Sequence, residues 1–506
     1  MKARIPLTSL AGLALAALPV GAQSNRSTTA ASSPFSAAID DVASRLFALG
    51  ATPGVGIVVV RDTQIIYLKG FGYADAEGKR AFTATTPFYI ASTTKSFTGL
   101  AAAILEQQGA WRLDDPLSKH VPSAKLSAPL SADSISIRDL LTHTHGIASG
   151  PVDMRLAYTG EYSGDAELIR LLAEHGPRPS GRAYEYSNLG YNVGAIAMDA
   201  VTRENWRETL QRMLFTPLGM TSTSAYVSKY PRASVALPYR AVASGFTPAY
   251  FGKTDANMQS AGGLMTTPAD MGRWLEVHIN GGKLDGRQVL PAAAVAETHK
   301  ILAPVSGSAR GLRQLGYGLG WQVAAYQGDT LLIHGGGFTG WSTHMSFVPG
   351  RKVGVSVMAN NSPLGGPLAD LMAFAIYDVL LGRPAITADS IAAIGGQLQL
   401  ARANIEADRA RRAARPQNLP YALEAYAGRF ENPAWGRLEI AVVGGKLEAR
   451  MGAAWSAVEV FDNTRNQLRT ELFGNGQVAT VEMKDGRAES VVTAGATFRR
   501  VGIGAP

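Results

Sequence analysis

The sequence contains no cysteine among its 506 residues. A disulfide framework, a thiol nucleophile and a thiolate metal site are therefore excluded. A chain of this length without covalent cross-links must depend on its hydrophobic core, and 46% of the residues are hydrophobic. Any hydrolytic chemistry has to come from a serine, a threonine or a metal-bound water.

The chain also has little net charge, +8 at neutral pH, and its basic residues are spread along the sequence. A weak and dispersed positive charge does not predict a nucleic-acid partner.

Long hydrophobic runs are scarce as well. The apolar stretch "IPLTSLAGLALAALPV" follows a short basic start and precedes Gly21-Ala22. Pro and Gly interrupt this stretch, and it is too short for a typical membrane span. It is typical of a secretory signal peptide cleaved near Ala22. We therefore expect a signal peptide over 1–22, a flexible tail over 23–34, a secreted or periplasmic location and no stable membrane insertion after cleavage.

The length of the chain favours more than one domain, and the patterns of apolar residues along it predict the same. Apolar strands near the start and between 330 and 359 enclose a mostly helical segment, which predicts an α/β domain over 35–385. We expect one largely antiparallel sheet with a helical subdomain. The Ala- and Arg-rich segment 386–416 predicts an exposed linker helix; an anion- or membrane-binding stripe is the less favoured interpretation.

The last segment, 417–506, differs in character from the rest. Its apolar stretches are separated by residues typical of hairpin turns, namely Gly444-Gly445, Gly474-Asn475-Gly476 and Asp485-Gly486. This pattern predicts a separate small β-barrel domain.

One short motif indicates chemistry. In "ASTTKSFTGLAAAIL", Ser92 precedes an apolar helical stripe and Lys95 follows one turn later. Residues three apart are neighbours on a helix, and a buried lysine loses its charge readily enough to accept a serine proton. An ordinary helix cap beside an exposed lysine would give the same letters.

Two further elements change this balance. Tyr186-Ser187-Asn188 is the only Y-x-N sequence in the chain, and His334-Gly335-Gly336 ends a predicted strand. Their order after Ser92 resembles the penicillin-recognising serine hydrolases, in particular the class C β-lactamase-like group of peptidases and esterases. The segments "LLTHTHGI", "LFTPLGMTST" and "SAGGLMTTPADMGRWL" resemble the same family, and the C-terminal segment resembles a lipocalin-like barrel that some members carry.

The resemblance implies a role for each of these residues. Ser92 is the acylated nucleophile, Lys95 its proton partner and Tyr186 the acid or base at the leaving group; which of the last two accepts the serine proton stays open. Asn188 would bind a substrate carbonyl, and the strand residues His334, Gly335 and Gly336 would contact substrate. The N–H groups of Ser92 and Gly337 would form the oxyanion hole.

The chain departs from the family at the third motif, where His334-Gly335 replaces Lys-Thr. A largely neutral histidine and a missing hydroxyl weaken binding of a β-lactam carboxylate and favour peptide or ester substrates. The pair His143 and His145 does not complete a metal-ligand pattern, because Ile147 and Ala148 stand where acidic and histidine ligands would be needed. We expect no metal and no cofactor.

The resulting hypothesis is an exported serine hydrolase acting through an acyl-enzyme, most simply a peptidase of small or unusual peptides: D-amino-acid-containing, cell-wall-like or linearised cyclic. The alternatives are a carboxylesterase or weak β-lactamase, and a non-catalytic penicillin-binding receptor. The expected partner is a small peptide or ester, with no nucleic acid and an open oligomeric state. The barrel is interpreted either as a lid or oligomerisation element or as a stabilising appendage.

Overall fold

The computed structural model describes residues 33–162 and 164–502. The predicted signal peptide, 1–22, and residues 23–32 of the predicted tail lie outside the described residues. Within the described residues, no helix is both long enough and apolar enough to cross a membrane.

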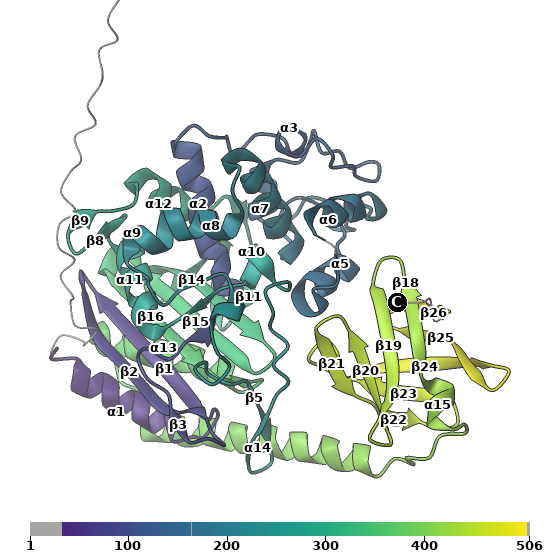
Figure 1. The fold of residues 1–506 in the computed structure, drawn as a ribbon. Coiled ribbons are helices and arrows are strands. Elements are labelled where there is room, and N and C mark those ends of the chain that lie inside the picture. The colour runs from purple at the N-terminus through teal and green to yellow at the C-terminus, as the bar shows by residue number, and fades with distance from the viewer. Residues whose placement is uncertain (1–32, 163, 503–506) are drawn as a thin grey trace, which may run out of the picture.

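A single large antiparallel sheet organises the first domain (Figure 1). Its strand order is β10-β12-β13-β14-β15-β16-β1-β2-β3, with β11 paired to β12. The two terminal segments of the domain meet in the middle, where β1 pairs with β16. The strands are β1 (Gly54–Arg61), β2 (Gln64–Asp75), β3 (Arg80–Ala81), β10 (Ala303–Pro304), β11 (Ser308–Ala309), β12 (Leu312–Tyr317), β13 (Gln322–Tyr326), β14 (Asp329–Phe338), β15 (Trp341–Val348) and β16 (Val353–Ala359).

Both faces of this sheet are buried, which explains why its strands are continuously apolar rather than alternating. In β1, Val58 and Val60 belong to the core under the helical region, while Ile57 and Val59 belong to the core on the opposite face. The second core contains α1 (Ser36–Phe47) and α13 (Gly365–Leu380). The predicted α/β architecture with an antiparallel sheet is confirmed.

The helical region packs on the other face and contains the long central helix α2 (Thr94–Gln107), of which Thr94 to Leu105 are buried. Its helices are α3 (Leu117–His120), α4 (Ile137–Leu141), α5 (Gly150–Met154), α6 (Asp165–Leu171), α7 (Asn188–Thr202), α8 (Trp206–Leu210), α9 (Thr216–Leu218), α10 (Gln259–Gly262), α11 (Pro268–Ile279) and α12 (Ala292–Thr298). Short strands accompany them: β4 (Phe88–Tyr89), β5 (Tyr239–Val242), β6 (Gly245–Pro248), β7 (Met265–Thr266), β8 (Lys283–Leu284), β9 (Arg287–Gln288) and β17 (Asn361–Ser362).

The helix α14 (Ala388–Ala413) occupies the segment predicted as a linker and has no buried residue. It runs along the base of the first domain toward the last one (Figure 1). One of its arginines is nevertheless anchored, because Arg402 donates hydrogen bonds to the carbonyls of Val242, Gly245 and Gly50. Arg412 pairs with Glu459 of the last domain, so α14 contacts both neighbours.

The last domain is a nine-stranded antiparallel sheet that curls into a nearly closed barrel, as the turn pattern predicted. Its core includes Phe430, Leu438 and Phe498. The strands, preceded by α15 (Leu423–Tyr426), are β18 (Gly428–Asn432), β19 (Gly436–Val443), β20 (Lys446–Met451), β21 (Ala454–Ala457), β22 (Glu459–Asp462), β23 (Gln467–Thr470), β24 (Gln477–Lys484), β25 (Arg487–Thr493) and β26 (Ala496–Arg500).

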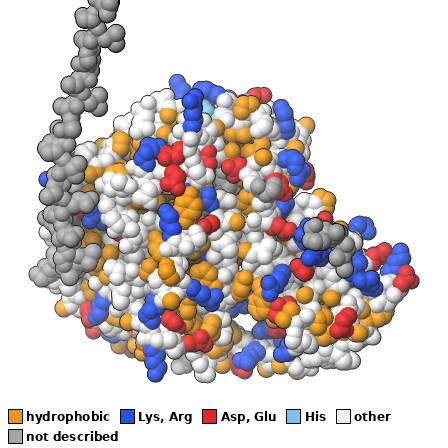
Figure 2. Space-filling view, viewed as in Figure 1, with side chains coloured by type: hydrophobic (Ala, Val, Ile, Leu, Met, Phe, Trp, Pro, Cys, Tyr) orange, Lys and Arg blue, Asp and Glu red, His pale blue; other side chains and the backbone are white. Residues whose placement is uncertain are grey.

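The surface visible in Figure 2 shows basic and acidic side chains interspersed rather than gathered by sign. This distribution agrees with the dispersed charge of the sequence.

Candidate active site

Ser92 lies in a short 3₁₀ turn, Ala91–Thr93, directly before α2. The preceding residue, Ala91, is buried and has a φ of 46°, in the left-handed region that an alanine rarely adopts. Strained backbone of this kind costs about 1–3 kcal/mol and is characteristic of functional sites. Ser92 itself is half-buried, so its hydroxyl is held at the end of the core helix and stays accessible.

Lys95 is fully buried and its amine reaches three oxygen atoms. Its Nζ lies 3.3 Å from Ser92 Oγ, and it donates to Asn188 Oδ1 at 2.8 Å and to the carbonyl of Ala261 at 2.7 Å. The structure therefore places the lysine beside the serine, as the motif predicted, and not on a solvated helix face.

This environment favours the neutral amine. Burial lowers the pKa of Lys95 from 10.5 to about 7, and the carboxylate of Asp153 opposes that change. A neutral amine has two N–H donors, which Asn188 and Ala261 accept, and one lone pair. The lone pair is then available to the Ser92 hydroxyl, which is the arrangement of a general base beside its nucleophile.

Tyr186 completes the cluster. Lys95 Nζ lies 4.7 Å from the centroid of the Tyr186 ring, and a side-chain hydrogen bond with Ser92 lowers the pKa of the Tyr186 hydroxyl. Although 39% of Tyr186 is exposed, desolvation of its hydroxyl in the site raises its pKa well above the ordinary value of 10, so the phenol stays protonated near neutral pH. The ring of His143 packs against it at 4.5 Å between centroids.

Asn188 is the first residue of α7, and a carboxylate holds that helix end in place. Asp153 accepts from the backbone N–H of Leu189 at 2.6 Å and from the hydroxyl of Ser187 at 3.0 Å. Asp153 thus fixes the segment that carries both Tyr186 and Asn188. No sequence motif pointed to this residue, which lies 34 positions before Ser187.

Strand β14 forms the opposite wall of the site. A Cβ at Gly336 would overlap the carbonyl oxygen of Ile90, so only glycine allows the strand to approach the turn that carries Ser92. Gly337 is exposed and has open space at its Cβ position. Strand β13 pairs with β14 only from Asp329 to Ile333, which leaves the edge from His334 to Phe338 without a strand partner on that side.

His334 is buried and cannot act as a surface cation. Its Nδ1 lies 2.8 Å from the carbonyl of Gly335 and must donate to it, so Nε2 accepts from the hydroxyl of Tyr317 at 3.2 Å. Burial lowers the pKa of His334 to about 3. The expected contact with substrate can therefore be only a neutral one.

His145 is held in place by a buried arginine, Arg178, that no sequence pattern singled out. Arg178 Nη2 lies 2.9 Å from His145 Nε2, and the same guanidinium donates to the carbonyls of Ile147 and Glu185. It joins the His143–Ile147 loop to the irregular segment that leads into Tyr186. Within the described residues, no group of three or more histidine or acidic side chains is arranged to hold a metal ion.

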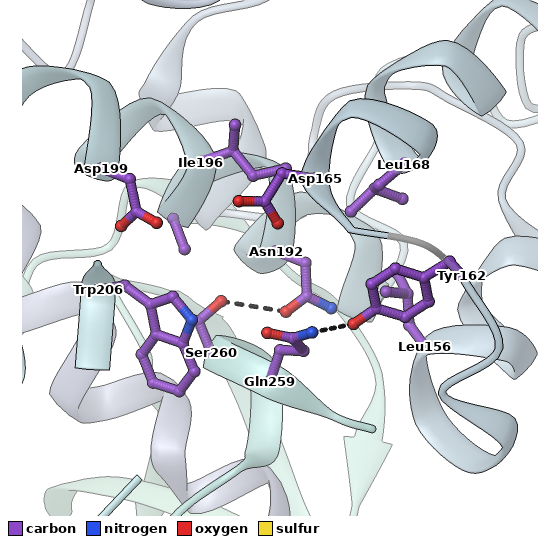
Figure 3. Close-up of a pocket in the computed structure, with 11 residues that line it drawn as sticks. Leu156, Tyr162, Asp165, Leu168, Asn192, Ile196, Asp199, Trp206, Gln259 and Ser260 are labelled. Carbon is purple, nitrogen blue, oxygen red and sulfur yellow. Dashed lines mark hydrogen bonds between the residues drawn. The ribbon is translucent and has the colours of Figure 1, made fainter. Parts of the chain in front are cut away.

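A cavity of about 10 Å³ is lined by residues of α6, α7 and α10, among them Asn192, Gln259 and Ser260 (Figure 3). Asn192 in its wall accepts from the hydroxyl of Ser260 at 3.0 Å and from the N–H of Ala261 at 3.3 Å. This pairing holds the carbonyl of Ala261 toward Lys95. Asp165 and Asp199 also line the cavity, whereas Ser92 does not, so the cavity lies next to the residues that support the site.

The barrel touches the wall of the site through aromatic rings. Tyr158 stacks on Phe338 of β14 at 5.3 Å and contacts Phe473 of the barrel at 5.8 Å. Glu161 accepts from the backbone N–H of Arg437, also in the barrel. A second cavity, of about 30 Å³, opens at this boundary, lined by Tyr158, Phe338, Tyr250, Trp455, Arg240 and Glu471 among others.

Comparisons with solved structures find the same fold. The octameric penicillin-binding protein homologue from Pyrococcus abyssi matches with a TM-score of 0.58 and 22% identity, covering 91% of this chain and 99% of that one. The D-amino acid amidase from Ochrobactrum anthropi SV3 matches with a TM-score of 0.58 and 23% identity over 69% of this chain and 98% of its own.

Among curated proteins, Protein flp of Staphylococcus aureus is 28% identical over 325 residues, and unguisins hydrolase ungD of Aspergillus violaceofuscus is 26% identical over 364 residues. These matches cover 64% and 66% of this chain. The chain spans 62% of the length of these relatives.

The family model described as Beta-lactamase matches residues 39–376. The chain therefore belongs to the Beta-lactamase family of hydrolases, as the order of its motifs indicated.

Proposed function

We propose that the protein is a serine hydrolase that cleaves amide bonds in small peptides through an acyl-enzyme on Ser92. The observation that carries this proposal is the contact between the Ser92 hydroxyl and the Lys95 amine, whose pKa of about 7 makes it a competent base at neutral pH. The intact set of nucleophile, base and phenol argues against a purely non-catalytic receptor.

The chemistry runs in two halves. Ser92 Oγ forms a bond to the substrate carbonyl carbon, and its proton passes to Lys95 or through Tyr186. The N–H groups of Ser92 and Gly337 stabilise the oxyanion, each contributing roughly 3–4 kcal/mol in such sites. The C–N bond then breaks as the leaving amine takes up a proton, and water hydrolyses the ester to return free Ser92 and a carboxylate.

The relatives support amide and peptide substrates. One structural neighbour is a D-amino acid amidase, and one curated relative is an unguisins hydrolase. Asn188 adds a local argument, because its Oδ1 accepts from Lys95, while its Nδ2 has no acceptor among the residues that the structure describes and can donate to a substrate carbonyl. Peptides containing D-residues, cell-wall-like peptides and linearised cyclic peptides are the proposed substrates.

The test combines labelling with product analysis. The mature protein and its Ser92→Ala variant are treated with a fluorophosphonate probe, which phosphonylates activated serines with loss of fluoride, and with a library of L- and D-peptides read by mass spectrometry. We expect labelling and cleavage by the wild type alone, with thermal transitions that agree within a degree or two. Ser92→Ala turnover more than about a thousandfold above the uncatalysed rate would contradict the assignment, since binding and the oxyanion hole alone reach that level.

The same experiment separates the alternatives. Labelling with hydrolysis of esters or β-lactams but not peptides would favour the esterase or weak β-lactamase. Stoichiometric labelling with no product would favour the receptor.

We also propose export to the periplasm or medium, on the basis of the N-terminal sequence pattern. Edman sequencing of the protein recovered outside the cytoplasm should give a start near residue 23, and recovery of the uncleaved chain in the cytoplasm would contradict it.

A further inference from the structure

One short segment, 150–161, lies between the catalytic cluster and the barrel. It begins with α5 and continues directly into a π-helical turn, Arg155–Thr159, so that Asp153 and Thr159 belong to one continuous stretch of helix. Turns of this kind are rare and occur frequently at functional sites. In Figure 1, α5 lies on the side of the first domain that faces the barrel. The segment can therefore link the position of the barrel to the geometry of the site.

Two turns of the barrel dock on this segment through backbone groups. At the β20–β21 turn, Ala453 donates its N–H to the carbonyl of Thr159 at 2.8 Å, and a Cβ at Gly452 would overlap the same carbonyl. Near the start of β19, the N–H of Arg437 donates to both oxygens of Glu161, at 3.1 and 3.0 Å. The barrel is thus bound at two places, and one of them needs a glycine.

Side chains of the segment extend this docking. Met154 and Tyr158 pack against the core of the barrel. Arg155 is buried, donates to the carbonyl of Glu161 at 2.9 Å and reaches the carbonyl of Ala434 in the barrel at 3.4 Å. The barrel therefore contacts the segment along most of its length.

On its inner side, the segment supports one oxygen acceptor of the Lys95 amine. The carboxylate of Asp153 fixes the first turn of α7 by accepting from the N–H of Leu189 at 2.6 Å. Asn188, in the same turn, accepts from Lys95 Nζ at 2.8 Å. A displacement of Asp153 would therefore move this amide away from the amine.

The second acceptor, the carbonyl of Ala261, depends on the same segment. The carbonyl of Leu156 accepts from the N–H of Met258 at 2.5 Å. The carbonyl of Tyr158 accepts from Asn257 Nδ2 at 3.2 Å. Both donors lead directly into α10, which presents Ala261 to the amine at 2.7 Å. Both acceptors of the catalytic amine are thus supported by the segment on which the barrel docks.

We propose that the docked barrel is a positioning element of the active site, which holds the segment 150–161 and, through it, both oxygen acceptors of the Lys95 amine. The inference rests on the proposed function and adds a role for the barrel in the chemical step. A lid would change which substrates reach Ser92, and a stabilising appendage would change neither access nor chemistry. A positioning element instead sets how fast Ser92 reacts, even with a probe too small to touch the barrel.

The experiment measures the rate at which a small fluorophosphonate phosphonylates Ser92 in the full-length enzyme. The test variant is Gly452→Ala, whose methyl group would press on the carbonyl of Thr159. Gly444→Ala is its matched control, because the two glycines have similar φ values, 52° and 56°, while the Cβ position at 444 is open. We expect Gly452→Ala to lower the rate about 10- to 100-fold, as a misplacement of about 1 Å can do, and Gly444→Ala to change it less than about twofold.

A second pair of variants leaves the barrel sequence unchanged. Glu161→Ala removes the acceptor of the Arg437 N–H, whereas Glu161→Gln keeps one side-chain oxygen in its place. We expect Glu161→Ala to lower the phosphonylation rate severalfold and Glu161→Gln to restore most of it. For a small uncharged peptide amide, kcat should fall in parallel, while KM stays near the wild-type value.

A pH profile gives a readout that a loss of stability alone would not move. The carboxylate of Asp153 raises the pKa of Lys95, so a displaced segment should move the inflection of the rate to lower pH in Gly452→Ala and leave it in place in Gly444→Ala. The histidines and tyrosines that also face Lys95 lie outside the segment; they are His143, His334, Tyr186 and Tyr191.

Wild-type rates in both Gly452→Ala and Glu161→Ala would overturn the proposal. An equal loss in Gly444→Ala would also refute it, because strain within the barrel would then be the cause. A loss confined to long peptides, with normal reaction of the small probe, would contradict it in favour of the lid. Failure of the proposed function would look different, because Ser92 would then stay unlabelled in the wild type as well.

Discussion

We expect the environment of Lys95 to set the pH dependence of the proposed acylation, which distinguishes the two candidate bases. The drop in the pKa of Lys95 from 10.5 to about 7 corresponds to about 5 kcal/mol that burial takes from the charged form. If the neutral amine accepts the Ser92 proton, kcat/KM for an uncharged substrate should be flat above pH 7 and fall about tenfold per pH unit below it. At pH 5 the rate should be about one hundredth of its plateau.

The alternative predicts another profile. Desolvation of the Tyr186 hydroxyl raises its pKa above 10, so a phenolate base would give a rate that keeps rising with pH to at least that value. The assay is the rate of reaction at Ser92 between pH 5 and 10.5, measured either as acylation by an uncharged peptide amide or as phosphonylation by the fluorophosphonate probe. A profile that is flat down to pH 5, or one that still rises above pH 9, would refute the reasoning from Lys95.

Controls assign the inflection to its group. Asp153→Asn removes a carboxylate that raises the pKa of Lys95, so the inflection should move to lower pH. Asp199 and Lys253 also have a pKa of about 7 for reasons of burial, but neither contacts Ser92. In Asp199→Asn and Lys253→Gln the inflection should therefore stay in place.

Two further substitutions test the walls of the site. Gly336→Ala would force β14 away from the carbonyl of Ile90, and we expect at least a tenfold loss of kcat/KM with a lower melting temperature; normal activity would show that the strand need not approach the turn. Phe473→Ala removes the barrel ring that contacts Tyr158, and if the barrel shapes the site it should raise KM severalfold while kcat changes less than twofold. Unchanged kinetics would favour the stabilising-appendage interpretation.

Local patterns predicted the parts of the site that are close in sequence. The pair Ser92 and Lys95 is visible because a helix brings residues three apart together. The close approach of β14 to the turn that carries Ser92 could be predicted, because consecutive glycines in a strand often mark a place where another backbone or a ligand comes close. The strands themselves could be predicted from continuous apolar runs, since both faces of the sheet are buried.

The remaining parts depend on contacts that no local pattern records. The Arg310 guanidinium fills the space that a side chain at Gly335 would occupy, and it pairs with Asp370, which lies 60 positions further along the chain. Arg178 stabilises His145 across 33 positions, and Asp153 holds the start of α7 from the short helix α5, whose sequence carries no recognised motif. Each of these residues resembles an ordinary surface charge until the fold places its partner.

The helix α14 also sets the distance between the two domains and their relative rotation about the helix axis. Its 26 residues span about 39 Å, and each residue advances a helix by about 1.5 Å and turns it by about 100°. Because Arg402 fixes the helix to the first domain and Arg412 meets the barrel, one inserted residue between them would swing the barrel through more than a quarter turn. An insertion of seven residues would restore the orientation to within about 20° and shift the barrel by about 10 Å. Natural or engineered changes in this helix should therefore be tolerated in steps of whole turns, whereas single insertions would carry the barrel off its contact with Tyr158.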